Sequence, residues 1–169
     1  MNQKIQLVPR TEIDRTLEKQ LHDWFEAKFG RADRWAEPDH YVILSLDGQV
    51  AGRLGVLDTK VAVGNQIIRV GGIGGVATKP EFRHRGVAKA MLARAAEFMK
   101  NDLGLEFAFL LCRHEVSAVY SKLGWIIVAG PTTFTRAGVT ATYPNDTMIL
   151  PLGGKAWPSG PIDMLGLPW

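Results

Sequence analysis

The feature that most constrains the fold is a strand–helix–strand succession between residues 66 and 112. A glycine-rich, extended segment (residues 66–78) ends before Pro80, and apolar side chains then recur at helical spacing over residues 86–100. The apolar run LEFAFLLC that follows has the length of a strand and is typical of a strand covered on both faces. Because two strands joined by a helical crossover pair in parallel, we expect one parallel pair in the sheet.

The rest of the chain predicts mainly antiparallel neighbours. Residues 4–8 alternate as a first strand, and the pairs Asp47-Gly48 and Gly64-Asn65 mark two turns between apolar runs. WIIVA and DTMILPL are the last strand candidates, separated by a turn-rich stretch over residues 130–145. The sum is an α+β layer fold, with a mixed, mainly antiparallel sheet and flanking helices.

Two further helices are expected. The motif TEID predicts a capping box with Thr11 as the N-cap and Asp14 as its reciprocal partner. The helix that follows has an apolar face at helical spacing and stops at Gly30. A short helix is expected over residues 115–123, closed by Gly124.

Length and composition predict a single domain over residues 1–169, since the chain is long enough for one well-buried core. Its last segment, residues 153–169, is rich in Gly and Pro but also in Trp and Leu, so we expect a tail that packs on the body. No secretory signal and no apolar run of about 18 residues is visible, which favours a cytoplasmic protein without a membrane partner. The single Cys112, at the end of an apolar strand, is expected to be a small core residue, and no metal site is expected.

Two neighbouring segments could approach a phosphate. The GGIGG run (residues 71–75) is followed by extended residues and Pro80, so it opens no helix and fits neither a dinucleotide fingerprint nor a Walker loop. Its glycines indicate a bulge, the close approach of another backbone or a ligand, or a poorly specified strand. RHRGVA (residues 83–88) lies where a helix begins, and free N–H groups and the helix dipole there attract anions. A basic loop that merely starts a helix has the same pattern.

RHRGVA resembles the signature Arg/Gln-x-x-Gly-x-Gly/Ala of the Gcn5-related N-acetyltransferase (GNAT) superfamily, with Arg83, Gly86 and Ala88 as the matching residues. SAVYSKLGW resembles a second family segment, with Tyr120 and Gly124 in register. The resemblance implies the GNAT fold, in which the pantetheine arm of coenzyme A enters between two splayed parallel strands. It also implies acetyl transfer from acetyl-CoA to an amine, with the diphosphate at RHRGVA and the glycine strand facing the reacting end.

The resemblance also implies individual roles. The residues expected to contact acetyl-CoA are Val76, Ala77, Thr78, Arg83, His84, Arg85, Gly86, Val87, Ala88 and Ser117. Tyr120 is the expected proton donor to the departing thiolate, although a tyrosine on an amphipathic helix can also be a core residue. The carboxylate that many relatives carry on the glycine strand is replaced by Gly74. A water relay or another residue, such as His114 or Glu115, would then accept the amine proton.

The C-terminal half resembles the aminoglycoside 2'-N-acetyltransferases and the nodulation-factor N-acyltransferases, both of which acylate an amine on a sugar. The segments GWIIVAGPTTF, NDTMILPLGG and WPSGPIDMLGLPW carry this resemblance. It implies a small-molecule amine as substrate, a role in antibiotic resistance if that amine is an aminoglycoside, and an acceptor site formed by Trp35, Glu37, Asp146, Asp163 and Trp169, the last through an α-carboxylate. Because few acidic residues follow position 115, a small amine or a peptide N-terminus remains open as acceptor.

Other functions also fit parts of the pattern. A longer acyl chain could replace acetyl, and the absent carboxylate at Gly74 would suit a sensor that binds coenzyme A without turnover. The basic patch would suit nucleic acid, but Glu81 interrupts it and no recognition helix or aromatic platform is evident, so no nucleic-acid partner is expected. An exposed strand edge would allow a homodimer.

Overall fold

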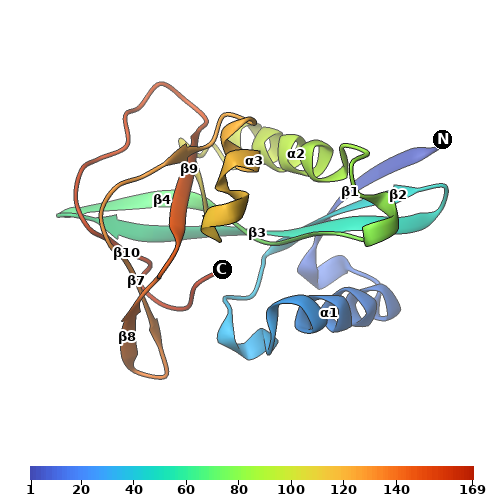
Figure 1. Ribbon diagram of the computed structural model, residues 1–169, viewed down its shortest axis with the longest axis horizontal. Helices are drawn as coiled ribbons and strands as arrows, with labels where there is room; N and C mark the ends of the chain where they lie inside the picture. Colours follow the sequence, from blue (N-terminus) through green and yellow to red (C-terminus); the bar gives the residue numbers. More distant parts are fainter.

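Hairpin turns and one helical crossover organise the chain into a curved mixed sheet with helices on both of its faces (Figure 1). The computed structural model describes residues 1–169. Its strands are β1 (Gln3–Pro9), β2 (His40–Leu46), β3 (Gln49–Val63), β4 (Gln66–Thr78), β5 (Phe107–Cys112), β6 (Ile126–Ile127), β7 (Thr132–Arg136), β8 (Val139–Thr142), β9 (Asp146–Pro151) and β10 (Ile162–Asp163). Its helices are α1 (Arg15–Phe29), α2 (Val87–Asn101) and α3 (Ser117–Ser121). The predicted α+β class is confirmed.

The sheet has the predicted mixture of pairings. Strands β1 to β4 pair antiparallel in succession, and the main sheet runs in the order β6-β9-β5-β4-β3-β10-β7-β8. The turn between β2 and β3 has positive φ at both Asp47 (47°) and Gly48 (81°), as a type I′ turn requires. Strand β5 pairs with β4 in parallel, but only where Gly71, Gly72 and Ile73 face Ala108, Phe109 and Leu110. Beyond this short ladder the two strands separate.

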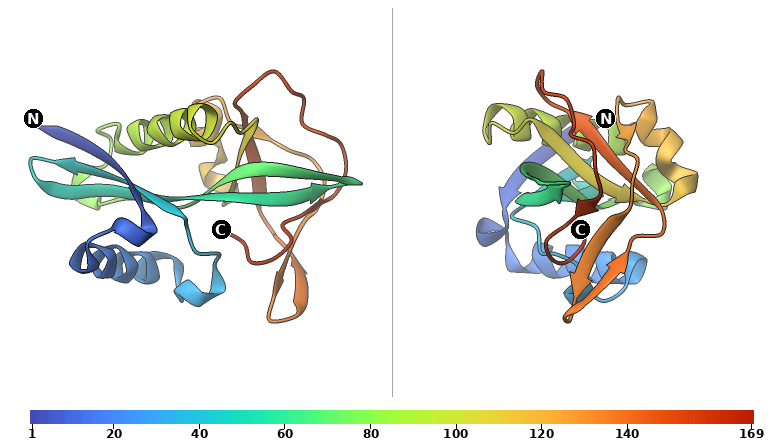
Figure 2. Two further views of the ribbon diagram at one scale, coloured as in Figure 1. Left: turned by 180° about the vertical axis from the view of Figure 1, so that it is seen from behind. Right: turned by 90° about the vertical axis from the view of Figure 1, so that its left-hand side faces the viewer.

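Helix α2 covers one face of the sheet, and α1 lies on the opposite face (Figures 1 and 2). The stripe predicted from helical periodicity is buried at every position, namely Val87, Met91, Leu92, Ala95, Phe98 and Met99. Each large apolar side chain of this kind contributes about 1.5–3 kcal/mol when fully buried. The α2 stripe therefore anchors the helix on strands β1 to β4.

Helix α1 starts later than its sequence motif predicts. Asp14, not Thr11, is the N-cap, and its side chain accepts a hydrogen bond from the N–H of Leu17 at 3.0 Å. Thr11 lies in a short 3-10 turn, and Ile13 is extended (φ −72°, ψ 141°). Ile13 is buried with Leu21 in a small apolar cluster between α1 and β2, so its burial fixes where the helix can begin. The predicted capping box is therefore wrong, whereas the predicted end at Gly30 is confirmed.

The stretch over residues 130–145 contains a hairpin that the sequence did not indicate. Strands β7 and β8 pair antiparallel around Ala137 and Gly138, both with positive φ. The C-terminal segment crosses this region, and its strand β10 pairs antiparallel with β3 and in parallel with β7. Its last residue, Trp169, is 5% exposed and lies in an apolar cluster with Phe109. The tail thus completes the sheet beside β3.

The glycines of the GGIGG run make room for other parts of the protein. A Cβ on Gly71 would lie 2.0 Å from Sδ of Met99 on α2, and one on Gly72 would lie 2.5 Å from the indole nitrogen of Trp169. A Cβ on Gly74 would lie 2.9 Å from the main-chain carboxyl carbon of Trp169. The predicted close approach of another backbone is found at Gly74, whereas Gly71 and Gly72 make room for the side chains of Met99 and Trp169.

We predict that Gly71→Ala destabilises the protein. The added methyl group has no space beside Met99, so the free energy of unfolding should fall by about 1–3 kcal/mol, the usual effect of overpacking. Gly154→Ala is the matched control, because nothing lies within 4 Å of its Cβ position and its φ lies outside the left-handed region. Urea unfolding would measure both, and equal stabilities would contradict the packing assigned to Gly71.

Candidate functional site

The separation of β4 from β5 opens a cleft of about 880 Å³ beside the parallel ladder. Gly74, Gly75, Val76 and Thr78 of β4 form one wall, and residues 110–112 of β5 form the other. From Gly74 onward β4 has no ladder partner on the β5 side, so main-chain groups there, apart from the Val76 carbonyl that accepts from Lys28, can bind a ligand. A bound molecule with amide groups could continue the sheet at this edge.

The basic loop borders the outer end of this cleft. Gly86 caps α2 in the left-handed conformation (φ 74°), and His84 is also left-handed (φ 62°). Arg83, His84, Gly86, Val87 and Ala88 all line the cleft. The unpaired N–H groups of the first turn of α2 lie at the same place, so charge and helix dipole act together on an anion.

Three of the expected coenzyme A contacts do not line the cleft. Ala77 is buried, opposite Arg53 on β3. The guanidinium of Arg85 stacks over the Phe82 ring, 5.7 Å from its centroid. Ser117 is buried, and its hydroxyl donates to the carbonyl of His114 at 2.8 Å. Ala77 and Ser117 are thus buried, whereas Arg85 is exposed beside Phe82.

Tyr120 projects from α3 into the cleft and packs edge-on against Trp125, with ring centroids 6.1 Å apart. Burial, and secondarily Cys112, raises the pKa of its phenol to about 12. A phenol with this pKa is protonated at neutral pH, so it holds a proton at the wall of the cleft, and as an acid it is weaker than an ordinary tyrosine.

Cys112 is a poor nucleophile in this setting. Its side chain is 6% exposed, and Sγ lies 3.7 Å from Sδ of Met148. Burial raises the pKa of the thiol to about 11, with smaller contributions from Asp146 and Glu115. The thiol is therefore protonated at neutral pH, which confirms the prediction that it is a core residue.

Sequence reasoning missed several cationic and aromatic groups in the cleft. Lys28, at the end of α1, donates from Nζ to the Val76 carbonyl at 3.3 Å. Burial lowers the pKa of Lys28, and the nearby Arg83 and Arg113 lower it further. Arg113 directly follows β5, at the carboxyl end of a parallel strand where ligands commonly bind, so its position was a usable signal. Lys28 offered no such signal, because helical periodicity does not reveal what the far end of a long side chain reaches.

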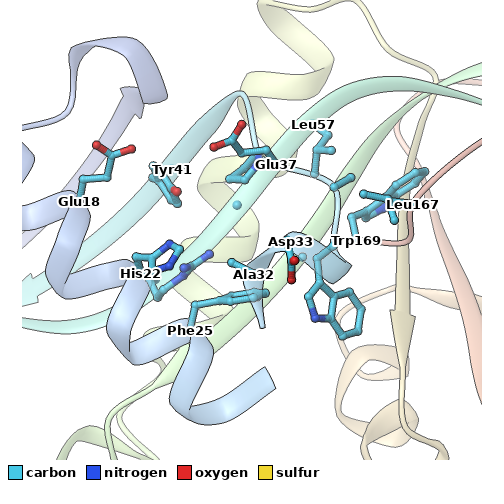
Figure 3. Close-up of a pocket in the computed structure, with 17 residues that line it drawn as sticks. Glu18, His22, Phe25, Ala32, Asp33, Glu37, Tyr41, Leu57, Leu167 and Trp169 are labelled. Atoms are coloured by element: carbon cyan, nitrogen blue, oxygen red, sulfur yellow. The ribbon is translucent and has the colours of Figure 1, made fainter. Parts of the chain in front are cut away.

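A second cavity of about 490 Å³ lies between α1 and the sheet (Figure 3). Trp35, Glu37 and Trp169, three of the predicted acceptor residues, line it. Figure 3 shows His22 and Phe25 of α1 together with Glu18, Tyr41 and Asp33 around the same space. Aromatic faces and carboxylates at one site can bind the rings, hydroxyls or ammonium group of a small polar molecule.

Two predicted acceptor residues line neither cavity. Asp146 accepts a hydrogen bond from Nδ1 of His114 at 2.8 Å, and Asp163 accepts one from the N–H of Leu165 at 2.9 Å. His114 and Glu115 also lie outside both cavities. The structure therefore does not bring these groups to the place where an acceptor amine would react.

The two cavities meet at the bulged part of β4. Gly74, Gly75, Phe25, Trp35 and Trp169 line both of them. Gly75 is left-handed (φ 60°), and the register between β3 and β4 shifts beside it. A molecule in one cavity can thus contact a molecule in the other at this point of the strand.

This geometry agrees with the comparisons to known proteins. A family profile described as acetyltransferase (GNAT) domain matches residues 14–128, and the chain belongs to this family. No curated protein matches the chain. GNAT acetyltransferases use acetyl-CoA as co-substrate, so the chain is an N-acetyltransferase by family, and the suspected resemblance is confirmed at that level.

Solved structures share the fold at low sequence identity. Escherichia coli ElaA has a TM-score of 0.64 at 13% identity, with 88% of this chain and 99% of that chain covered. An acyl-CoA N-acyltransferase from Pseudomonas aeruginosa has a TM-score of 0.59 at 15% identity, covering 88% and 99%. A GNAT-family acetyltransferase from Staphylococcus aureus has a TM-score of 0.59 at 13% identity, covering 89% and 100%. The predicted GNAT fold is thereby confirmed.

The structure has neither a membrane-spanning helix nor a cluster of metal-binding side chains. None of the helices has the length and apolar character needed to cross a membrane. His, Cys, Asp and Glu side chains nowhere gather in a group of three or more that could hold a metal ion.

The loop geometry predicts unequal roles for its arginines. Arg83→Ala should weaken coenzyme A binding roughly 10- to 100-fold, since a charge-assisted hydrogen bond contributes about 1.5–3 kcal/mol. Arg85→Ala, which removes a side chain stacked on Phe82, should change the dissociation constant less than about threefold. Calorimetric titration with coenzyme A would measure both. A larger loss in Arg85→Ala than in Arg83→Ala would contradict the assignment.

Proposed function

We propose that the chain transfers the acetyl group of acetyl-CoA to the primary amine of an amino sugar bound in the cavity between α1 and the sheet. The observation that carries the proposal is the cleft between β4 and β5, with an anion-binding loop at one end and the acceptor cavity at the other. The first half of the proposal follows from the family. The acceptor rests on the lining of the second cavity and on the resemblance of the C-terminal half to sugar-amine acyltransferases.

Coenzyme A would lie with its diphosphate at Arg83 and the first turn of α2, and with its pantetheine arm along the free edge of β4. The thioester would then reach the bulge at Gly75. Main-chain N–H groups near Val76 would polarise its carbonyl and stabilise the oxyanion that forms on attack.

The chemical step moves one acetyl group from sulfur to nitrogen. One proton leaves the amine, and one proton is added to the departing sulfur. The neutral amine attacks the thioester carbon, a C–N bond forms, and the C–S bond breaks. Tyr120 donates its phenolic proton to the departing sulfur. The amine proton passes to water in the acceptor cavity, because the main chain of Trp169 occupies the space that a side chain at Gly74 would need.

Acetyl is favoured over a longer acyl chain by the position of the tail. The Trp169 indole covers Gly72, and Nε1 donates to the Phe109 carbonyl at 3.2 Å. Space that the glycine strand would otherwise leave for an acyl chain is thus filled by the protein itself. This observation supports a short donor.

The proposal is tested by incubating the protein with acetyl-CoA and a panel of amino sugars, aminoglycosides and small amines. Release of free thiol together with a product heavier by one acetyl group on an amino sugar is the expected result. Turnover with longer acyl-CoA thioesters but not acetyl-CoA would reject the donor. Tight coenzyme A binding without turnover on any amine would favour a sensor instead.

Tyr120→Phe should lower kcat by roughly 10²- to 10⁴-fold and leave the KM for acetyl-CoA nearly unchanged, since only the proton donor is lost. In the wild type, the pKa of about 12 means that the phenol stays protonated up to strongly alkaline pH. The kcat–pH profile should therefore show no alkaline decline due to Tyr120 below about pH 10. Steady-state kinetics over about pH 6–10 would check this. A wild-type kcat in the Phe variant would remove the acid role.

A further inference from the structure

Arg53 is a buried cation without an acidic partner. Its side chain extends from β3, and the residue is 3% exposed. The guanidinium lies between two aromatic rings, 5.1 Å from the centroid of Phe25 and 5.2 Å from that of Tyr41. These cation–π contacts offset part of the cost of burial but supply no hydrogen-bond acceptor.

The hydrogen-bonding capacity of Arg53 is largely unused. Nη1 donates to the main-chain carbonyl of Leu21 at a long 3.4 Å, and Nε is buried with no partner at all. Arg53 forms no ion pair, since no carboxylate lies within 4.0 Å of its guanidinium. Burial lowers the pKa to about 10, so the group is still charged at neutral pH. Buried charges in proteins are normally paired or bound to a ligand.

The location of this cation links it to the acceptor cavity. Arg53 lines that cavity, and Nη2 lies 2.7 Å from the position that a Cβ on Gly75 would take. Gly75 in turn lines both cavities. An anion bound to the guanidinium would therefore lie near the point where acceptor and thioester meet.

Two of the three carboxylates that line the cavity are paired at its rim. Asp33 is paired with Arg31, and Glu37 lies 3.5 Å from Arg10 with most of its side chain exposed. Glu18, the remaining carboxylate of the lining, makes no ion pair with Arg53. Such exposed pairs contribute little free energy, whereas a ligand that pairs with a buried, unpaired guanidinium can contribute much more.

We propose that the acceptor carries an anionic group, a carboxylate or a phosphate, which Arg53 binds next to the reacting amine. The inference rests on the proposed acetyl transfer and narrows its acceptor. The planar guanidinium matches both anions in a two-point geometry, so it fixes orientation as well as position. A polycationic aminoglycoside would instead bring positive charge against a buried cation. The acceptor is thus an acidic amino sugar, or an amino acid in place of the amino sugar proposed above.

The test compares ligands that differ in the anion. Glucosamine 6-phosphate is paired with glucosamine, and phenylalanine with phenylalaninamide, so each pair keeps the primary amine and differs in one anionic group. Calorimetric titration into the coenzyme A-saturated protein should give at least tenfold tighter binding for the acidic member of one pair, and which pair responds identifies the anion. Equal or weaker binding of both acidic members would overturn the inference.

Variants then assign the preference to Arg53. Arg53→Gln should bring the affinity ratio within that pair to about one, and Arg53→Lys should retain part of it, because a charge without the guanidinium fork remains. Arg69→Gln is the matched control, since Arg69 lies exposed on the same sheet, is paired with Asp58 and lines neither cavity. Retention of the full ratio in Arg53→Gln would overturn the assignment.

Turnover distinguishes this inference from the proposed function. Binding preference without thiol release on any acceptor would reject acetyl transfer and leave an anion-binding pocket. Thiol release that favours the neutral member of each pair would keep acetyl transfer and reject the anion. Loss of kcat in Arg53→Gln by one factor for all four acceptors would assign Arg53 to the oxyanion and also reject the inference.

Discussion

The parallel ladder between β4 and β5 is the contact on which the rest of the molecule depends. It joins Gly71–Ile73 to Ala108–Leu110 and then stops. The ladder ends because each strand continues against a different neighbour. Strand β5 pairs with β9 up to Cys112, and β4 pairs with β3 through a bulge at Gly75. Each strand is therefore held by its outer neighbour while the inner edge opens. The cleft is a consequence of strand pairing and does not require a moving part.

The tail decides how the opened space is divided. Trp169 fits over Gly72 and Gly74, where any side chain on the strand would collide with it. The N–H of Ala36 donates to the carbonyl of Pro168 at 2.7 Å, so the same segment also holds the loop that follows α1. The acceptor cavity thus has walls from α1, the β1–β4 meander and the C-terminal segment at once. Its shape depends on residues more than a hundred positions apart, whereas the coenzyme A loop is local to the chain.

This difference explains what the sequence could and could not predict. The α2 stripe, the Asp47-Gly48 turn and the basic loop are local patterns whose physical cause lies within a few residues, and the structure has them where they were expected. The hairpin around Ala137 was missed because alanine is disfavoured at positive φ, so nothing local indicated it. Thr11 was chosen as a cap because the motif fits, but burial of Ile13 outweighs the motif. The role of Arg53 was not predicted because it depends on the surroundings of its guanidinium, which come from Phe25, Tyr41 and Gly75 on other elements.

The distribution of charge favours an anionic group in both cavities. Lys28, Arg83 and Arg113 surround the cleft between β4 and β5 closely enough that the two arginines help to lower the pKa of Lys28. Arg113 is paired with Glu115 at 3.4 Å, and an anion in the cleft would further relieve the mutual repulsion of the three cations. In the acceptor cavity the imbalance is a single buried guanidinium beneath partly neutralised carboxylates. An acceptor with a neutral amine and an anionic group would pair with the guanidinium without adding positive charge near the thioester. Its amine would lie at the junction of the two cavities, where both ligands can contact the strand at Gly75.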